Sequence, residues 1–68
     1  MSKVNVYLAD GFEEVEGLTV VDLLRRAGIE TDMVSIMGRK EITGARKIPV
    51  LADKRFEEQD DPDVIVLP

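Results

Sequence analysis

Apolar and polar residues alternate with two different periods along the first half of the chain. Residues 3–9 alternate with period 2, which is typical of a strand with one buried face. Residues 14–27 repeat their apolar positions at helical spacing, and Gly28 suits the position just after a helix end. Asp10, followed three residues later by Glu13, fits a capping box for this helix. The pattern then changes back, which predicts a second strand over residues 31–37.

The second half of the chain predicts a ribbon and one more strand. Residues 41–51 indicate an antiparallel ribbon with a turn at Gly44, in which Pro49 limits one arm to an edge. Residues 54–61 are polar, with Phe56 as a satellite core residue, and residues 64–67 form a continuous apolar run. A helix between two strands makes the strands parallel, and we expect the last strand to lie parallel to the first. The predicted fold class is α/β, the N-terminal portion of a flavodoxin-like (Rossmann-like) parallel sheet with a β-ribbon insertion.

One acidic residue interrupts the apolar stripe of the predicted helix. With Val15 at 0°, most apolar residues fall in an arc from about 80° to about 240°, and Glu16 falls near 100°, between Leu23 and Ala27. A carboxylate facing a core is costly unless it is paired or protonated. Glu16 is therefore the first candidate for a working acid, whereas Glu13 and Glu14 are interpreted as charges that favour the helix dipole.

The small size of the chain indicates that more protein belongs to the fold. A domain of 68 residues buries only about 60% of the surface that its unfolded chain exposes. The sequence has no cysteine, so no disulfide compensates. We expect residues 1–68 to be the N-terminal part of a single larger domain. Val15 and Leu18 fall on the polar side of the helix, which predicts a partner there: the remainder of the domain, a second copy, or both.

Composition and charge narrow the possible partners and location. The formal net charge of −5 argues against a nucleic-acid or anionic-membrane surface, and no run approaches the ~18 apolar residues of a membrane span. The N-terminus enters a strand directly and does not resemble a signal peptide, so we expect a cytoplasmic protein. Asp60, Asp61 and Asp63 lack the spacing of a calcium loop and are interpreted as a solvated turn, and no metal site is predicted.

The topology itself predicts where chemistry would occur. Open parallel sheets bind ligands beyond the carboxyl ends of their strands, where the strand order reverses. In a 2-1-3 order this crevice lies between the first and third strands of the parallel sheet, beside the loop that begins at Asp10 and Gly11 and one turn from Glu16. We expect the Glu16 carboxyl to lie there with its pKa raised by desolvation.

Two segments carry a resemblance to a known family. Residues 8–16 (LADGFEEVE) and 18–29 (LTVVDLLRRAGI) resemble the start of the ThiJ/PfpI family, within the class I glutamine-amidotransferase-like superfamily. The similarity continues to residues 63–68 (DVIVLP), after which family members usually continue with Gly-Gly.

The resemblance implies a role for several residues. Glu16 matches an acid that hydrogen-bonds a nucleophilic cysteine located further along the family's sequence, and this chain contains no cysteine. Arg46 matches an arginine near the dimer-facing edge of the site, and Gly11 and Phe12 would line the substrate pocket. The chain alone is therefore expected to be inactive, and dimers through the helix and the ribbon are implied.

Two classes of function follow from the resemblance. The first is a cysteine-dependent, cofactor-free enzyme of the deglycase, glyoxalase or hydrolase type, acting on small carbonyl compounds or their adducts. The second is a non-enzymatic redox-sensing or chaperone-like stress protein, or a homologue associated with the thiamine pathway. A flavodoxin-like receiver is disfavoured, since receivers carry paired acids after the first strand and Asp10 stands alone here.

Overall fold

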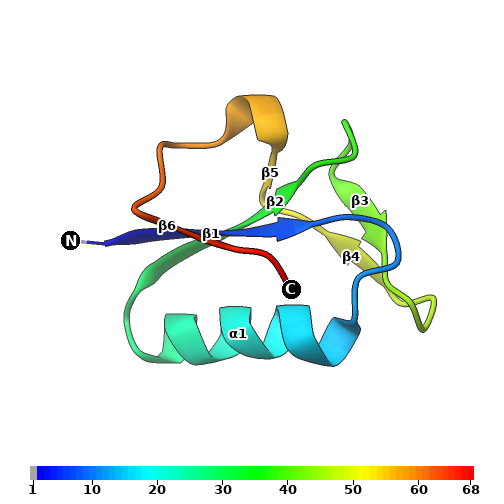
Figure 1. Cartoon of the computed structure of the whole chain (residues 1–68), viewed down its shortest axis with the longest axis horizontal. Coiled ribbons are helices and arrows are strands. Elements are labelled where there is room, and N and C mark those ends of the chain that lie inside the picture. The colour runs from blue at the N-terminus through cyan, green and yellow to red at the C-terminus, as the bar shows by residue number, and fades with distance from the viewer. Residues whose placement is uncertain (1) are drawn as a thin grey trace.

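A computed structural model describes residues 2–68 as one parallel sheet, one helix and a separate ribbon. The elements follow in the order β1 (Lys3–Leu8), α1 (Glu14–Arg26), β2 (Glu30–Ser35), β3 (Glu41–Thr43), β4 (Pro49–Leu51), β5 (Lys54–Arg55), the 3-10 turn η1 (Phe56–Glu58) and β6 (Val64–Val66). The helix α1 lies against one side of the sheet and η1 lies on the other (Figure 1). The α/β class and the parallel sheet predicted from the sequence are confirmed.

The sheet has the strand order β5-β2-β1-β6, and every pairing in it is parallel. The register places Val6 opposite both Met33 of β2 and Val66 of β6, so β1 is central. The antiparallel pair β3–β4 forms the predicted ribbon, with Ile42 opposite Val50. The strand β5 and the turn η1 were not predicted, because a two-residue Lys-Arg strand leaves no alternation in the sequence.

The hydrophobic core lies between β1 and α1. Its buried members come from β1, α1, the loop between them, β3 and the residue after β4: Val4, Val6, Leu8, Phe12, Val21, Ile42 and Ala52. Leu18 and Met33 pack against this core and are partly buried. The prediction that Leu18 lies on the outer face of the helix is therefore wrong, whereas Val15 is 77% exposed as expected.

The helix turns a different face to the core from the one the sequence predicted. Leu23 is exposed, and so is Glu16, although both fall in the apolar arc of the helical wheel drawn from Val15 at 0°. The buried helical residues are Glu14, Gly17 and Val21. Gly17 belongs to this face: a Cβ at this position would lie 2.9 Å from the Phe12 ring and 3.2 Å from Leu8, so glycine allows the helix to lie this close to both side chains. Glycine adds nothing to a hydrophobic stripe, and the wheel therefore missed the contact.

The ends of the helix differ in how they agree with the sequence. Gly28 has φ +78 and its N–H donates to the Arg25 carbonyl, as expected for the residue after a helix end. No side chain caps the start at Glu13, so the predicted capping box is wrong. Asp10 instead accepts a hydrogen bond from the Thr43 N–H and pairs with Arg39.

A network of charged side chains lies on the sheet face opposite α1. Asp32 pairs with Lys3 at 2.8 Å and with Lys54 at 3.0 Å, and Asp60 pairs with Lys54 at 2.6 Å and Lys3 at 3.3 Å. Asp60 is therefore ion-paired rather than part of a solvated turn, and Asp63 accepts the Lys3 N–H at 2.6 Å. Phe56 is 51% exposed and packs edge-on against Tyr7, so its predicted place in a satellite core is not found.

This network makes the stability of the fold sensitive to acid. Hydrogen bonds from Lys54 and Lys3 lower the pKa of Asp60, and desolvation raises the pKa of Asp32 less than the same two lysines lower it. Carboxylates with a lowered folded pKa stabilise above their unfolded pKa of about 3.9, and the stabilisation is lost as pH falls through the folded value. Asp60→Asn should therefore destabilise the protein at pH 7 and reduce its loss of stability between about pH 4 and pH 2, as measured by urea unfolding.

The matched control for this prediction is Asp61→Asn, since Asp61 is an exposed neighbour. It should leave the unfolding midpoint at pH 7 close to that of the wild type. If the free energy of unfolding fell equally between about pH 4 and pH 2 in Asp60→Asn and in the wild type, the assignment of acid sensitivity to Asp60 would be contradicted.

Candidate functional site

The loop that leaves the carboxyl end of β1 holds most of the predicted site. Gly11 adopts φ +88, a left-handed conformation that favours glycine, and it turns the chain toward α1. The Phe12 N–H donates to the Ala9 carbonyl at 3.1 Å and closes this turn. Gly11 thus has the turn role that the sequence indicated.

The β3–β4 ribbon is fastened to this loop by backbone hydrogen bonds. The Gly11 N–H donates to the Thr43 carbonyl at 2.8 Å, and the Ala45 N–H donates to the Phe12 carbonyl at 2.8 Å. Asp10 adds a third link, because its Oδ1 accepts the Thr43 N–H at 3.0 Å. That bond is the largest cause of the lowered pKa of Asp10; desolvation opposes it and Arg39 adds to it.

Glu14 supplies the last links between the ribbon and the helix. Its Oε2 accepts the Arg46 N–H at 2.8 Å and the Ile48 N–H at 3.4 Å, and only 7% of the residue is exposed. Desolvation raises the pKa of Glu14, but hydrogen bonds from backbone N–H groups, those of Arg46 and Ile48 among them, outweigh it and leave the pKa lowered. The sequence indicated that Glu14 is a charge that favours the helix dipole, and Glu14 does lie in the first turn of α1, but its burial and its bonds to the ribbon were not expected.

A signal for Glu14 was present in the sequence. Residues 14, 17 and 21 are spaced as one helical face, and all three are buried. The face was missed because one of its members is glycine and another is charged. The acidic residue that reaches the core side of the helix is therefore Glu14 and not Glu16.

The predicted site residues are brought together only in part. Gly11 and Phe12 contact the turn that carries Arg46, and Glu16 lies in the first turn of the adjoining helix. The Phe12 ring is buried under Gly17, and the backbone N–H and carbonyl of Phe12 are hydrogen-bonded to Ala9 and Ala45. Glu16 is exposed within residues 2–68. That its carboxyl lies in a crevice stays a prediction for the complete domain. Arg46 is also exposed, with its backbone held by Glu14.

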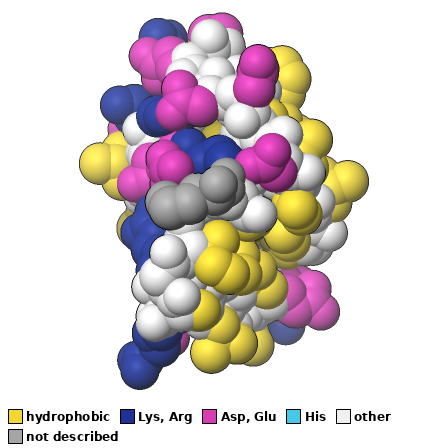
Figure 2. Space-filling model, turned by 90° about the vertical axis from the view of Figure 1, so that its left-hand side faces the viewer, with side chains coloured by type: hydrophobic (Ala, Val, Ile, Leu, Met, Phe, Trp, Pro, Cys, Tyr) yellow, Lys and Arg dark blue, Asp and Glu magenta, His cyan; other side chains and the backbone are white. Residues whose placement is uncertain are grey.

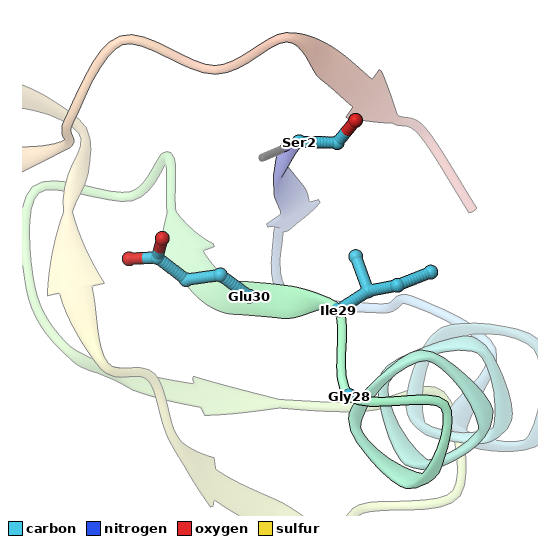
Figure 3. Close-up of a pocket in the computed structure, with 4 residues that line it drawn as sticks. All are labelled: Ser2, Gly28, Ile29 and Glu30. Carbon is cyan, nitrogen blue, oxygen red and sulfur yellow. The ribbon is translucent and has the colours of Figure 1, made fainter.

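A hollow of about 210 Å³ lies at the other end of the sheet, lined by Ser2, Gly28, Ile29 and Glu30. Figure 3 shows it between the start of β1 and the turn from α1 into β2, with the Glu30 carboxylate pointing away from Ile29. Glu30 lies at the start of β2, whereas the predicted site follows the end of β1. Because these two strands are parallel, the hollow and the predicted site lie at opposite ends of the sheet. This hollow is therefore separate from the residues singled out in the sequence.

Within residues 2–68, no group of three His, Cys, Asp or Glu side chains is placed to hold a metal ion. Over the same range α1 is the one α-helix, and it is too short and too polar to span a membrane.

The sheet order and the loop at the carboxyl end of β1 define an open parallel α/β fold of the flavodoxin-like type. The DJ-1/PfpI family model matches residues 2–68, and the chain belongs to that family. The chain is similar to the Parkinson disease protein 7 homolog of Danio rerio (35% identical over 66 residues) and to the protein dj-1beta of Drosophila melanogaster (37% over 65 residues). Each comparison covers 93% of this chain and 35% of the relative.

Solved structures agree with this assignment. A DJ-1 superfamily protein from Salmonella typhimurium, solved as a mutant with a cysteine replaced by alanine, superposes with a TM-score of 0.94 at 37% identity. An oxidized DJ-1 from Toxoplasma gondii superposes with a TM-score of 0.93 at 34% identity. Each comparison covers all of this chain and 38% of the other. The chain thus spans little more than a third of the length of these relatives.

Proposed function

We propose that this chain forms the N-terminal part of a DJ-1/PfpI domain and contributes Glu16 as the supporting acid for a nucleophilic cysteine located elsewhere in that domain. The observation that carries the proposal is the placement of Glu16 in the first turn of α1, exposed, immediately after the loop at the carboxyl end of β1. In parallel sheets this is the edge where ligands bind.

The chemistry follows from the pairing of a carboxyl group and a thiol. A protonated Glu16 donates a hydrogen bond to the thiolate and stabilises it. The thiolate adds to the carbonyl carbon of a small aldehyde or ketone, and the carbonyl oxygen takes up a proton. This is cofactor-free chemistry of the deglycase, glyoxalase or hydrolase type. Gly11, Phe12 and Arg46 would line the pocket for the small-molecule substrate.

The test compares Glu16 with an exposed neighbour in the complete domain. Glu16→Ala should raise the pKa of the thiol and slow its alkylation by iodoacetamide at neutral pH, because the donor is lost. Glu16→Gln keeps a donor and should retain most of the wild-type rate. Glu13→Ala is the matched control, because Glu13 is also an exposed glutamate and lies at the start of the same helix. Equal alkylation rates in the wild type and Glu16→Ala would reject the assignment.

A non-enzymatic function is the second candidate. The Toxoplasma gondii DJ-1 structure is of an oxidized form, which favours an oxidation-linked function as the alternative for the complete domain. Turnover of a 2-oxoaldehyde by the complete domain favours the enzyme. Cysteine oxidation without turnover favours a sensor or chaperone-like stress protein. A cytoplasmic location is part of both proposals and is checked by cell fractionation.

The exposed apolar side chains support a proposal about partners. Val64, Ile65 and Leu67 are 49%, 48% and 76% exposed, and Leu23 on α1 is 59% exposed. Figure 2 shows hydrophobic side chains gathered on one flank of the molecule, beside a region of mixed charges. We propose that the remainder of the domain covers β6, and that a second copy meets α1 and the ribbon.

Light scattering checks this association. The 68-residue chain alone should form oligomers or bind the remainder of the domain when the two are mixed, because isolated surfaces of this apolar character are rarely left open. A stable folded monomer of 7.6 kDa that does not bind the remainder of the domain would contradict the proposal.

A further inference from the structure

Glu14 is the one glutamate of residues 13–16 that the fold buries. Glu13 and Glu16 are exposed, whereas Glu14 reaches under the turn between β3 and β4. Its Oε2 accepts two backbone N–H groups of that turn, from Arg46 and Ile48. Its Oε1 is also buried and has no hydrogen-bond partner among residues 2–68. Burying a carboxylate is costly, so its position calls for a specific role.

The turn itself is built around this carboxylate. A side chain at Gly44 would collide with the carboxyl group of Glu14, so glycine leaves the room that Glu14 occupies. The turn is closed by the Gly44 N–H donating to the Ile48 carbonyl at 3.0 Å, and by the Lys47 N–H donating to the Gly44 carbonyl at 2.9 Å. Lys47 has a backbone φ of +65, which is uncommon for a residue other than glycine. External bonds from Glu14 help to hold such a turn in one shape.

The consequence concerns Arg46, which sits at the tip of this turn. Its N–H is fixed by Glu14 at 2.8 Å, and the neighbouring Ala45 N–H is fixed by the Phe12 carbonyl at 2.8 Å. The Arg46 backbone is thus tied at two consecutive residues to the loop and helix that carry Glu16. The guanidinium group of Arg46 remains exposed at the surface.

We propose that Glu14 is a positioning residue, whose carboxylate fixes the Gly44–Ile48 turn so that the Arg46 guanidinium is held beside the reacting thiol. This inference rests on the proposed function. Glu14 itself contacts neither substrate nor thiol, and it acts through the backbone of Arg46.

The experiment uses two alkylating probes of different charge on the complete domain. Iodoacetate is an anion and iodoacetamide is neutral, so a guanidinium beside the thiol raises the rate ratio of the first to the second. Arg46→Ala should lower this ratio several-fold, and Glu14→Ala should lower it to a similar extent. Glu14→Gln keeps an oxygen acceptor for the Arg46 N–H and should retain most of the wild-type ratio. Glu13→Ala is the matched control and should not change it.

Amide hydrogen exchange reports the position of the turn directly. Protection of the Arg46 and Ile48 amides should fall about 10-fold or more in Glu14→Ala, while the central β1 amide of Val6 keeps its protection and shows that the fold persists. Glu14→Gln keeps an oxygen acceptor and should retain most of this protection. Glu14→Asp shortens the side chain by one methylene, so it should lower the protection of both amides even if the alanine variant does not fold.

The outcomes separate this inference from the proposed function. An unchanged rate ratio in Glu14→Ala or in Arg46→Ala overturns the positioning role, as does unchanged protection of the two turn amides in Glu14→Ala. Glu16→Ala tests the proposed function alone: it should slow both probes by the same factor and leave the turn amides protected.

Discussion

Leu8→Ala should lower the free energy of unfolding by about 3 kcal/mol, within the range of about 2–5 kcal/mol for leucine truncation in a core. Leu8 is fully buried at the end of β1, and a Cβ at Gly17 of α1 would lie 3.2 Å from its side chain. The cavity would lie directly under the loop that carries Gly11 and Phe12. Since small domains are marginally stable, this single change removes a large share of the stability.

Urea unfolding followed by circular dichroism measures the effect. Leu51→Ala makes the same chemical change in the ribbon at a residue that is 65% exposed, and it should cost less than about 1 kcal/mol. Similar unfolding midpoints for the two variants would contradict the placement of Leu8 in the core.

Gly44→Val should be the second most disruptive change, at a cost of about 1–3 kcal/mol for overpacking. The new side chain would collide with the buried carboxyl group of Glu14, and either the turn or Glu14 must move. Both movements break the bonds from Arg46 and Ile48 to Glu14. We therefore expect a lower free energy of unfolding. In the complete domain we also expect a lower ratio of the thiol's alkylation rate with iodoacetate to that with iodoacetamide.

A double-mutant cycle checks the cause of this effect. Glu14→Ala removes the side chain that the valine meets, so Gly44→Val should cost less in that background than in the wild type. Equal costs in the two backgrounds would show that the collision with Glu14 is not responsible.

Much of the architecture could be predicted from residue periodicity. The strands β1, β2 and β6 and the helix α1 lie close to their predicted ranges, because each buries a face that repeats with its own period. The parallel pairing followed from the helix between β1 and β2. The pair β5 and η1 could not be predicted, since Lys54 and Arg55 are positioned by pairing to β2 and by ion pairs rather than by an apolar face.

The candidate site was less predictable than the fold. The loop at Gly11 and its neighbourhood with Arg46 could be predicted from topology and family resemblance together. The burial of Glu14 had a signal in the helical spacing of residues 14, 17 and 21, but its bonds to the ribbon had none, because their two backbone N–H donors lie more than 30 residues away. Glu16 is exposed although its wheel position fell in the apolar arc, because the buried face of α1 includes Gly17, which packs against Phe12 and which a hydrophobic stripe does not register.

The central position of β1 has a consequence for how the chain is made. Lys3 and Asp63 are 60 residues apart, and their hydrogen bond accompanies the pairing of β1 with β6. At about 5–20 residues per second, the ribosome needs roughly 3–12 s between these two residues. During that interval β1 has left the ribosome without its second neighbour, a state in which open strand edges pair wrongly. Lys3 and Asn5 place polar side chains on one face of β1, and they keep the waiting strand from being apolar on both faces.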